Sequence, residues 1–366
     1  MKRSILVGII AFTFAVSAYG QKIETPTLVP TPLNAAQQKT LNEGVALHDQ
    51  KKYDEAIAKY KSILAECPEC IGAMYELALS LDNKGEKDAA VELAYKGTKY
   101  KSTELPLFYV IIANRLDDTG KPEEAIKLYQ EGLKQLKDKE EFGRYRSSLS
   151  FNLAITYFRQ KKYAEAKEAA KSAATDSFEY ASPHFLLSVL FNGTQHKVPA
   201  LLAASRFLPL EYNTARATES LKIFNSILKP ATKDPKTGNT TIFLDLNAPK
   251  DEGDFGIFSL ILGTITTVRG DDDKDKSDNQ LYVDGISSLI AILDEDKKLK
   301  KTFVGRTYIP YMADMKKAGH VEAFGNMILF LTDNKNKEAE TWLNTNGAKV
   351  KSFLDWAKAY SLPKQS

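Results

Sequence analysis

The only two cysteines of the 366-residue chain, Cys67 and Cys70, stand around Pro68 in the stretch ECPEC. A C-x-x-C pair can be a redox site, half of a zinc site or a short disulfide. A structural zinc ion takes four ligands, and the sequence holds neither a further cysteine nor a suitably spaced histidine to complete the set. The pair therefore forms either a local disulfide or two free thiols, and a role in thiol–disulfide exchange is a third alternative.

The other residues that could bind a metal or catalyse a reaction are scattered along the chain. The four histidines lie far apart in sequence: His48, His184, His196 and His320. In the loop GDDDKDKSDN, Asp271, Asp273 and Asp275 alternate as calcium ligands do, but Lys276 and Tyr282 stand where an EF-hand needs glycine and glutamate. Neither a G-x-S-x-G nor a phosphate-binding glycine-rich motif is present. We therefore expect no enzyme activity, no cofactor and no metal site.

The first 20 residues have the order of a secretory signal. Lys2 and Arg3 precede an apolar run from Ile5 to about Val16, and small residues follow at Ala18 and Gly20. The run is shorter than the roughly 20 residues that span a membrane. We expect cleavage after Gly20 and export, most simply to the periplasm of a bacterium with an outer membrane, with no transmembrane segment in the mature chain.

The charges of the expected mature chain are balanced. Removal of residues 1–20 leaves 48 Lys and Arg residues against 47 Asp and Glu residues. A surface so balanced does not favour nucleic acid or anionic lipid as a partner. With 43% apolar residues, the chain is long enough for two domains with buried cores.

Similar segments recur along the first half of the chain. KYDEAI at 52–57, GEKDAAV at 85–91, GKPEEAI at 120–126 and KKYAEAK at 161–167 align on Ala56, Ala90, Ala125 and Ala166, and a fainter fifth copy aligns on Ala200. The spacings are 34, 35, 41 and 34 residues. Periods of this length are typical of proteins built from stacked helix pairs.

These segments resemble the tetratricopeptide repeat over about residues 36–208. The resemblance implies that each repeat is a pair of helices and that small residues let the two helices approach closely. Those residues are Gly44, Ala78, Ala113 and Ala154 on the first helices, and the four aligned alanines on the second. Larger residues would fill the gaps between pairs: Leu47, Leu81, Leu116, Tyr157, Tyr60 and Tyr129. Pro68 falls where the family commonly ends a second helix, because proline cannot continue the hydrogen-bond ladder.

We therefore predict an all-α protein with a repeat solenoid of four to five helix pairs and a smaller C-terminal helical domain. The predicted boundaries are a signal peptide at 1–20, an extended leader at 21–35, the solenoid with a capping helix at 36–230, a linker or loop at 231–252 and the C-terminal domain at 253–366. A short strand at 240–246 is a less favoured alternative to irregular structure there. The C-terminal part resembles no family that we can name.

In the repeat family the first helices line a concave groove that holds a partner's peptide or protein segment. Carried over by position, this implies twelve groove residues: Leu41, Val45, His48, Tyr75, Leu79, Asp82, Val110, Asn114, Asp117, Phe151, Ile155 and Phe158. The twelve include acidic and apolar residues but no Lys or Arg, so the basic clamp that some relatives use for a terminal carboxylate is not evident. An apolar or basic segment would fit this groove better than an acidic tail.

The predicted function is that of a non-enzymatic scaffold which binds a protein or peptide partner. An alternative is that the C-terminal domain binds a ligand or catalyses a reaction and docks through the repeats. A pocket there with converging Tyr308, Tyr311, Asp314 and His320 would favour that alternative. A solid core at the same residues would favour the scaffold.

Overall fold

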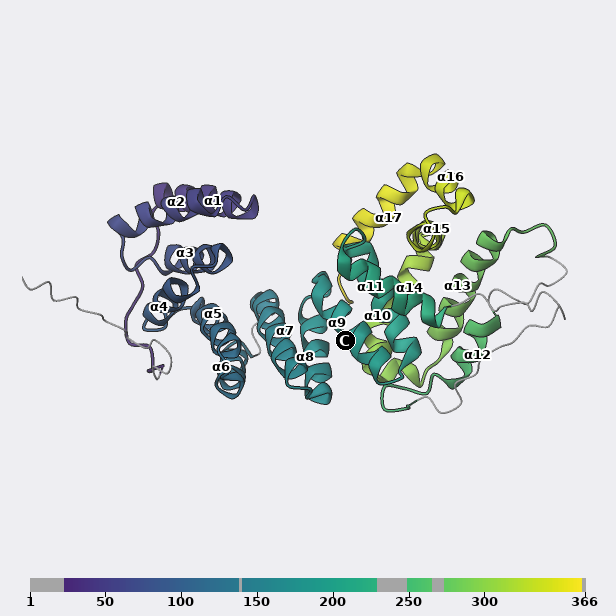
Figure 1. The fold of residues 1–366 in the computed structure, drawn as a ribbon, viewed down its shortest axis with the longest axis horizontal. Helices are drawn as coiled ribbons and strands as arrows, with labels where there is room; N and C mark the ends of the chain where they lie inside the picture. Colours follow the sequence, from purple (N-terminus) through teal and green to yellow (C-terminus); the bar gives the residue numbers. More distant parts are fainter. Residues whose placement is uncertain (1–22, 138–139, 229–248, 265–272, 364–366) are drawn as a thin grey trace, which may run out of the picture. The chain divides into compact units, whose positions relative to one another are not determined.

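The computed structural model describes residues 23–137, 140–228, 249–264 and 273–363 (Figure 1). Over these residues the regular elements are helices, and strand-like pairing is limited to a parallel bridge between Leu28 and Tyr100. The predicted all-α class is therefore confirmed. The signal segment at 1–20, the strand considered at 240–246 and most of the predicted linker lie outside the described residues, and the predicted domain boundaries stay predictions. The chain divides into two compact units, residues 1–135 (unit 1) and 136–366 (unit 2).

Unit 1 consists of three consecutive helix pairs preceded by an extended segment. The pairs are α1 (Ala35–Asp49) with α2 (Tyr53–Glu66), α3 (Ile71–Lys84) with α4 (Lys87–Gly97), and α5 (Leu105–Asp118) with α6 (Pro122–Gln135). The alanines that align on the second helices, Ala56, Ala90 and Ala125, are all completely buried. Gly44 shows why small residues are needed at the crossing, because a Cβ atom there would lie 2.5 Å from the Tyr60 ring.

Residues 23–34, which we call the leader strap, run along the joints between the helix pairs of unit 1. The Thr31 amide donates to the Glu69 carbonyl, between α2 and α3, at 3.2 Å. Further toward the N-terminus, Leu28 donates to Lys99 and accepts from Lys101, between α4 and α5, at 3.0 and 2.8 Å. A cavity of about 550 Å³ lies between residues 23–26 and helices α4, α5 and α6. From residue 23 to residue 34, the strap therefore passes the third helix pair first and the first helix pair last.

Unit 2 contains the remaining helices around one core. The elements, in chain order, are η1 (Glu140–Phe142), α7 (Gly143–Arg159), α8 (Tyr163–Asp176), α9 (Ala181–Gly193), α10 (Lys197–Leu210), α11 (Ala215–Ile227), α12 (Gly256–Thr264), α13 (Asp278–Glu295), η3 (Leu299–Lys301), α14 (Phe303–Lys317), α15 (Val321–Thr332), α16 (Lys337–Thr345) and α17 (Gly347–Ala359). The buried apolar residues form a continuous cluster from Ala154 to Ala357. None of the described helices combines the length and the apolar composition that crossing a membrane requires.

Helix α10 lies at the centre of unit 2. Every residue from 198 to 209 is buried, as expected for a helix that is apolar on all sides. It packs against α9 and α11, and also against α12, α14 and α17 from the C-terminal part of the chain. The fifth repeat and the C-terminal helices therefore share their core.

Arg206 is the one charged residue among the buried residues of α10, and its side chain is fully buried. Its guanidinium donates to the Phe178 carbonyl at 2.9 and 3.1 Å and to the Ala357 carbonyl at 2.6 Å. It also lies 4.4 Å from the centre of the Phe178 ring and 4.8 Å from that of Tyr311. The Ala357 carbonyl belongs to the last turn of α17, where the helix dipole is negative, and the Phe178 carbonyl belongs to the turn between α8 and α9. One cation thus joins that turn to the C-terminus of α17 inside the core.

The turn inside each of the five repeat pairs has the same geometry in both units. One residue of each turn has a left-handed backbone: Lys51, Gly85, Gly120, Lys161 and Gln195. The next amide donates to the carbonyl five residues earlier, as from Lys52 to Leu47 at 3.0 Å, which is the bond of a Schellman motif. Gly319 and the His320 amide repeat this arrangement between α14 and α15. The C-terminal part therefore contains a helix pair that turns as the repeats do.

Candidate functional site

The twelve predicted groove residues lie on the first helices of the repeats, and all twelve are half-buried. We call the surface that they form within each unit the groove face of that unit. Nine of its residues belong to α1, α3 and α5 of unit 1, and Phe151, Ile155 and Phe158 belong to α7 of unit 2. The opposite sides of the same helices carry buried residues such as Ala78, Leu81 and Ala113. Residues three and four apart share a helix face, so the repeat spacing alone aligns these side chains.

His48 is held by the neighbouring pair of helices. Its Nδ1 lies 2.7 Å from the Ser80 hydroxyl, and the Asn83 amide approaches its Nε2 at 3.5 Å. Burial lowers the pKa of His48, and the nearby Asp49 opposes this shift in part. The imidazole is therefore mainly neutral at pH 7 and serves as a hydrogen-bonding group of the groove face.

Aromatic and amide contacts fix two further groove residues of unit 1. The ring of Tyr75 meets that of Phe108 edge to face, with centroids 5.8 Å apart. The hydroxyl of Tyr129 in α6 donates to the Asn114 side-chain oxygen at 2.5 Å. Both side chains are thus positioned by the following helices before any partner binds.

Acidic side chains give the groove face of unit 1 its charge. Burial raises the pKa of Asp82, and the charge of Asp118 adds to this, while Lys87 and Arg115 act in the opposite direction. Glu76, one residue after Tyr75 on α3, is half-buried and was not among the predicted groove residues. The signal that could have identified it is its position, since Glu76 lies one helical turn before Ser80, the partner of His48.

The groove face of unit 2 is apolar. Phe151 meets Tyr180 edge to face at 5.4 Å, and Phe158 meets Tyr163 in the same way at 5.6 Å. Ile155 lies between the two phenylalanines on α7 and packs against the core. This part of the surface can offer contact area but no charge.

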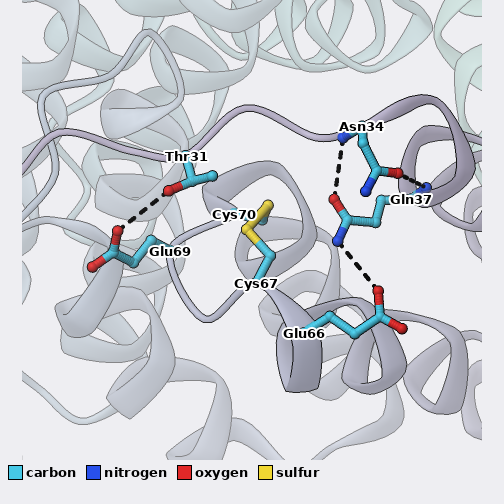
Figure 2. Close-up of a disulfide and its surroundings, with 7 residues drawn as sticks. All are labelled: Thr31, Asn34, Gln37, Glu66, Cys67, Glu69 and Cys70. Carbon is cyan, nitrogen blue, oxygen red and sulfur yellow. Dashed lines mark hydrogen bonds between the residues drawn. A yellow bond between two sulfur atoms is a disulfide. The ribbon is translucent and has the colours of Figure 1, made fainter.

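The cysteine pair lies at the joint between α2 and α3 (Figure 2). The sulfur atoms of Cys67 and Cys70 are joined, with Cα atoms 5.4 Å apart, and the two residues are 7% and 1% exposed. They pack with Ile63 and Ala73, and the loop between them is bonded to Thr31 of the leader strap through Glu69. A disulfide so enclosed is placed to hold a joint and is poorly placed to exchange with another thiol.

A Cys67→Ser, Cys70→Ser double variant should keep its repeats folded. Closing a loop this short stabilises a protein by about 2 kcal/mol at most on the chain-entropy estimate. Urea unfolding followed by circular dichroism, with wild type in reducing buffer as the control, measures the loss. Loss of partner binding by a variant that stays fully folded would restore the redox interpretation.

The residues proposed for a C-terminal pocket lie in and around the core of unit 2. Tyr308 and Tyr311 are completely buried. The Tyr308 hydroxyl lies 2.9 Å from Nδ1 of His184, whose pKa is lowered to about 3 by burial and by the charge of Arg206. Asp314 accepts a hydrogen bond from the Tyr360 hydroxyl at 2.9 Å. Tyr308 and Asp314 thus bond to other side chains of the protein, and the Tyr311 ring packs against Arg206 and Trp356. This packing favours the scaffold over a ligand pocket at this place.

His320 lies apart from them, beside Phe353 and Trp356 at the start of α15, and burial lowers its pKa. A cleft of about 590 Å³ does exist between α13, α14, α15 and α16. Two of its lining residues are hydrogen-bonded, since the Trp342 indole donates to the Glu322 carboxylate at 2.9 Å. None of the four residues proposed for a pocket lines this cleft.

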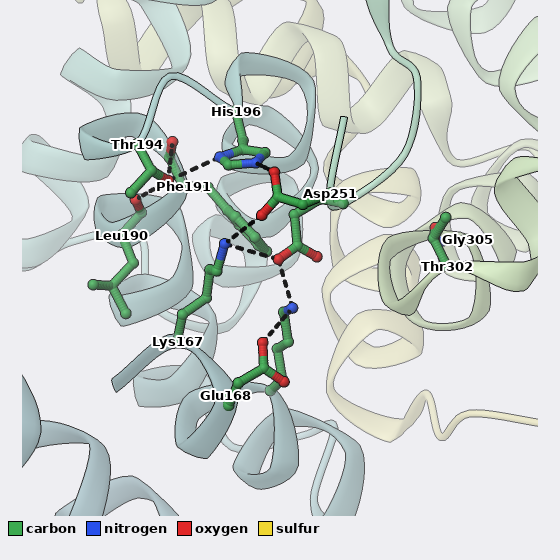
Figure 3. Close-up of polar contacts among 11 residues, drawn as sticks. Lys167, Glu168, Leu190, Phe191, Thr194, His196, Asp251, Thr302 and Gly305 are labelled. Carbon is green, nitrogen blue, oxygen red and sulfur yellow. Dashed lines mark hydrogen bonds and ion pairs between the residues drawn. The ribbon is translucent and has the colours of Figure 1, made fainter. Parts of the chain in front are cut away.

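His196 belongs to a polar cluster that fixes the segment at 249–254 (Figure 3). Its Nδ1 lies 2.8 Å from the Thr194 hydroxyl and its Nε2 lies 2.7 Å from Asp251. The order Thr–His–Asp is that of a nucleophilic triad, but the Thr194 hydroxyl donates to the Leu190 carbonyl at 2.8 Å and ends a helix. The hydrogen bond from His196, followed by that from Lys167, lowers the pKa of Asp251 to about 2. The arrangement secures a loop.

The same segment buries a carboxylate between two lysines. Glu252 is 4% exposed and lies 3.0 Å from the Lys167 ammonium and 2.5 Å from that of Lys171. Two ammonium groups therefore neutralise the charge of this buried carboxylate. In the part of the chain that the structure describes, no three His, Cys, Asp or Glu side chains gather as a metal site would require.

Comparison with known proteins agrees with the helix pairs. The sequence profile of the tetratricopeptide repeat matches residues 41–101 and 112–182. Among solved structures, a thermophilic TPR protein of Thermus thermophilus is 19% identical, with 51% of this chain and 98% of that chain covered at a TM-score of 0.40. PilF of Pseudomonas aeruginosa is 18% identical, with 54% of this chain and 93% of that chain covered at a TM-score of 0.39. YrrB, described as a TPR protein with an unusual peptide-binding site, is 14% identical, with 50% of this chain and 90% of that chain covered at a TM-score of 0.34. No curated protein matches the sequence. On this profile match, the chain contains tetratricopeptide repeats within residues 41–182.

Proposed function

We propose that this protein is a non-enzymatic scaffold whose groove face binds an apolar or basic segment of a protein partner. The observation that carries the proposal is the exposure of the groove face. All twelve residues remain partly exposed, whereas α3, α5 and α7 bury their other sides and α1 buries Gly44. Interaction through such helices is the general role of tetratricopeptide repeats. The acidic residues of unit 1 suit a basic segment, and the apolar residues of unit 2, taken by themselves, suit an apolar one.

We further propose that the protein acts in an exported compartment, most simply the periplasm. The signal-like order of residues 1–20 and the joined cysteines support this, because disulfides persist mainly in oxidising compartments. The mass of the protein purified from its host under non-reducing conditions tests the proposal. A chain of residues 21–366 with both thiols oxidised agrees with export, and an intact N-terminus with free thiols contradicts it.

The groove proposal predicts that a Tyr75→Ala, Asn114→Ala double variant loses most of its partner binding. Truncating two central contact residues commonly costs about 2 kcal/mol or more, which is about thirtyfold in affinity. The measurement is recovery of a crosslinked partner identified with the wild-type protein in its host. Tyr212→Ala is the matched control, since Tyr212 is 41% exposed, lies between α10 and α11 and is not one of the twelve groove residues. Equal recovery by the double variant and wild type, with unchanged circular dichroism, would contradict binding at this face.

A further inference from the structure

Glu76 is an acid that the fold partly buries without neutralising it. Its side chain is half-buried on α3, and within the described residues it forms neither a hydrogen bond nor an ion pair with a cation. Other acids of this chain are treated differently: Glu43 lies 2.6 Å from Lys59, and buried Glu252 has two lysines. Burying an unpaired charge is costly. A carboxylate left in this condition on a binding surface suits a cation that arrives from outside.

The surroundings of Glu76 add negative charge and a buried donor. Asp49 of α1 is close enough to raise the pKa of Glu76, and no cation offsets it. The Tyr60 hydroxyl of α2 is buried, and burial, followed by the charge of Glu76, raises the pKa of that phenol, while the Ser80 hydroxyl opposes this shift. His48 is occupied by Ser80 and is mainly neutral at pH 7. The corner between α1, α2 and α3 therefore contains two carboxylates and one buried hydroxyl.

We propose that Glu76, with Asp49 beside it, is the site at which the groove face of unit 1 receives a lysine or arginine side chain of the bound segment. The site rests on the proposed function, and it specifies which residue type the partner presents and where. The ammonium or guanidinium forms a charge-assisted hydrogen bond with the Glu76 carboxylate. The aliphatic part of the same side chain lies along the apolar groove residues Tyr75 and Leu79, as long cationic side chains do.

Titration of Glu76 makes the site sensitive to pH. Burial, followed by the charge of Asp49, raises the pKa of Glu76 to about 7. Among the described residues, the titratable groups that interact with Glu76 are Asp49 from α1 and Tyr60 from α2. The charges of Arg115 and Asp118 on α5 act on Asp82, six residues further along α3.

A cation binds the ionised form of Glu76. With a pKa of about 7, roughly nine-tenths of the protein is ionised at pH 8 and roughly one-tenth at pH 6. Apparent affinity scales with the fraction in the competent form, so binding should be about tenfold tighter at pH 8 than at pH 6. Binding in that range releases a proton, because the bound cation lowers the pKa of the carboxyl.

The test uses the mature chain and a peptide probe of known sequence. A phage-displayed library of random dodecapeptides is selected on residues 21–366 at pH 8, and an enriched peptide is synthesised with each Lys or Arg in turn replaced by Gln. Affinities are measured for wild type, Glu76→Gln and the control Glu92→Gln. Glu92 is an exposed residue of α4, so the control makes the same change of charge on a second helix of the repeats.

We expect enriched peptides to carry Lys or Arg, and one Lys or Arg replacement to weaken binding to wild type about tenfold. The same replacement should have little effect on Glu76→Gln, and only that variant should lose the difference between pH 6 and pH 8. If peptides bind and Tyr75→Ala, Asn114→Ala abolishes their binding, but Glu76→Gln binds as wild type does, the cation site is wrong and the groove proposal stands. If no peptide binding depends on groove residues, both fail.

Discussion

An Arg206→Met variant should lose about 3–5 kcal/mol of the free energy of unfolding of unit 2. Met retains much of the apolar length of Arg, but it donates no hydrogen bond. The buried carbonyl of Ala357 therefore loses the Arg206 donor, and that of Phe178 keeps only its contact with Nε2 of His184. An unsatisfied buried polar group costs about 1–3 kcal/mol, and removing one member of a buried charged network about 3–5 kcal/mol. Urea unfolding followed by tryptophan fluorescence measures the change.

Tryptophan fluorescence is suited to this purpose because both tryptophans of the chain, Trp342 and Trp356, belong to unit 2. Trp356 is stacked on Tyr311, with ring centroids 5.3 Å apart, next to the Arg206 guanidinium. Arg216→Met is the matched control. Arg216 is 40% exposed and pairs with Glu211, so its replacement should cost no more than about 1 kcal/mol. Equal losses for the two variants would show that Arg206 does not tie the turn after α8 to α17.

A Gly305→Ala variant should be destabilised by about 3 kcal/mol, at the upper end of the usual cost of overpacking. A Cβ atom on Gly305 would overlap the carbonyl of Leu299, which is backbone of η3 and has no side-chain freedom to move away. The backbone of Gly305 is also held in place by the N-cap of α14, since its amide donates to the Thr302 hydroxyl at 3.0 Å.

Gly347→Ala provides the comparison for Gly305→Ala. Gly347 begins α17, and no atom lies within 4 Å of the position its Cβ would take. Alanine has a higher helix propensity than glycine by up to about 1 kcal/mol, so this variant should be as stable as wild type or more stable. Both are measured by the tryptophan signal in urea. A Gly305→Ala protein that unfolds at the wild-type midpoint would mean that η3 can move away from α14.

The repeat pattern predicted most of the helix pairs because it depends on which side chains stand at fixed positions of each repeat. Alanine at a helix crossing and a proline after the second helix have steric causes that do not depend on distant parts of the chain. The same argument failed to detect the pair α14 and α15. Its turn matches the repeats at Gly319, but Met312 and Phe324 stand where the repeats have small residues. Backbone geometry was therefore shared without the sequence signature.

Two further features, the pKa of Glu76 and the burial of Arg206, could not be predicted because they depend on contacts between helices. The groove face follows from spacing within one helix, so its residues could be named in advance. The pKa of Glu76 depends on which groups of α1 and α2 lie beside it, and the sequence pattern does not contain this distance. Arg206 likewise interrupts an apolar run, and only the packing of α17 explains why the charge is inside.

The leader strap has a mechanical consequence for unit 1. Stacked helix pairs can bend by opening successive joints, in the way that a coil spring extends. The strap is bonded to the joint after the first pair through Thr31 and to the joint after the second through Leu28. Because only two residues separate these anchors, opening between the joints would stretch a segment with little slack and break its hydrogen bonds. The strap therefore limits extension along one edge of unit 1.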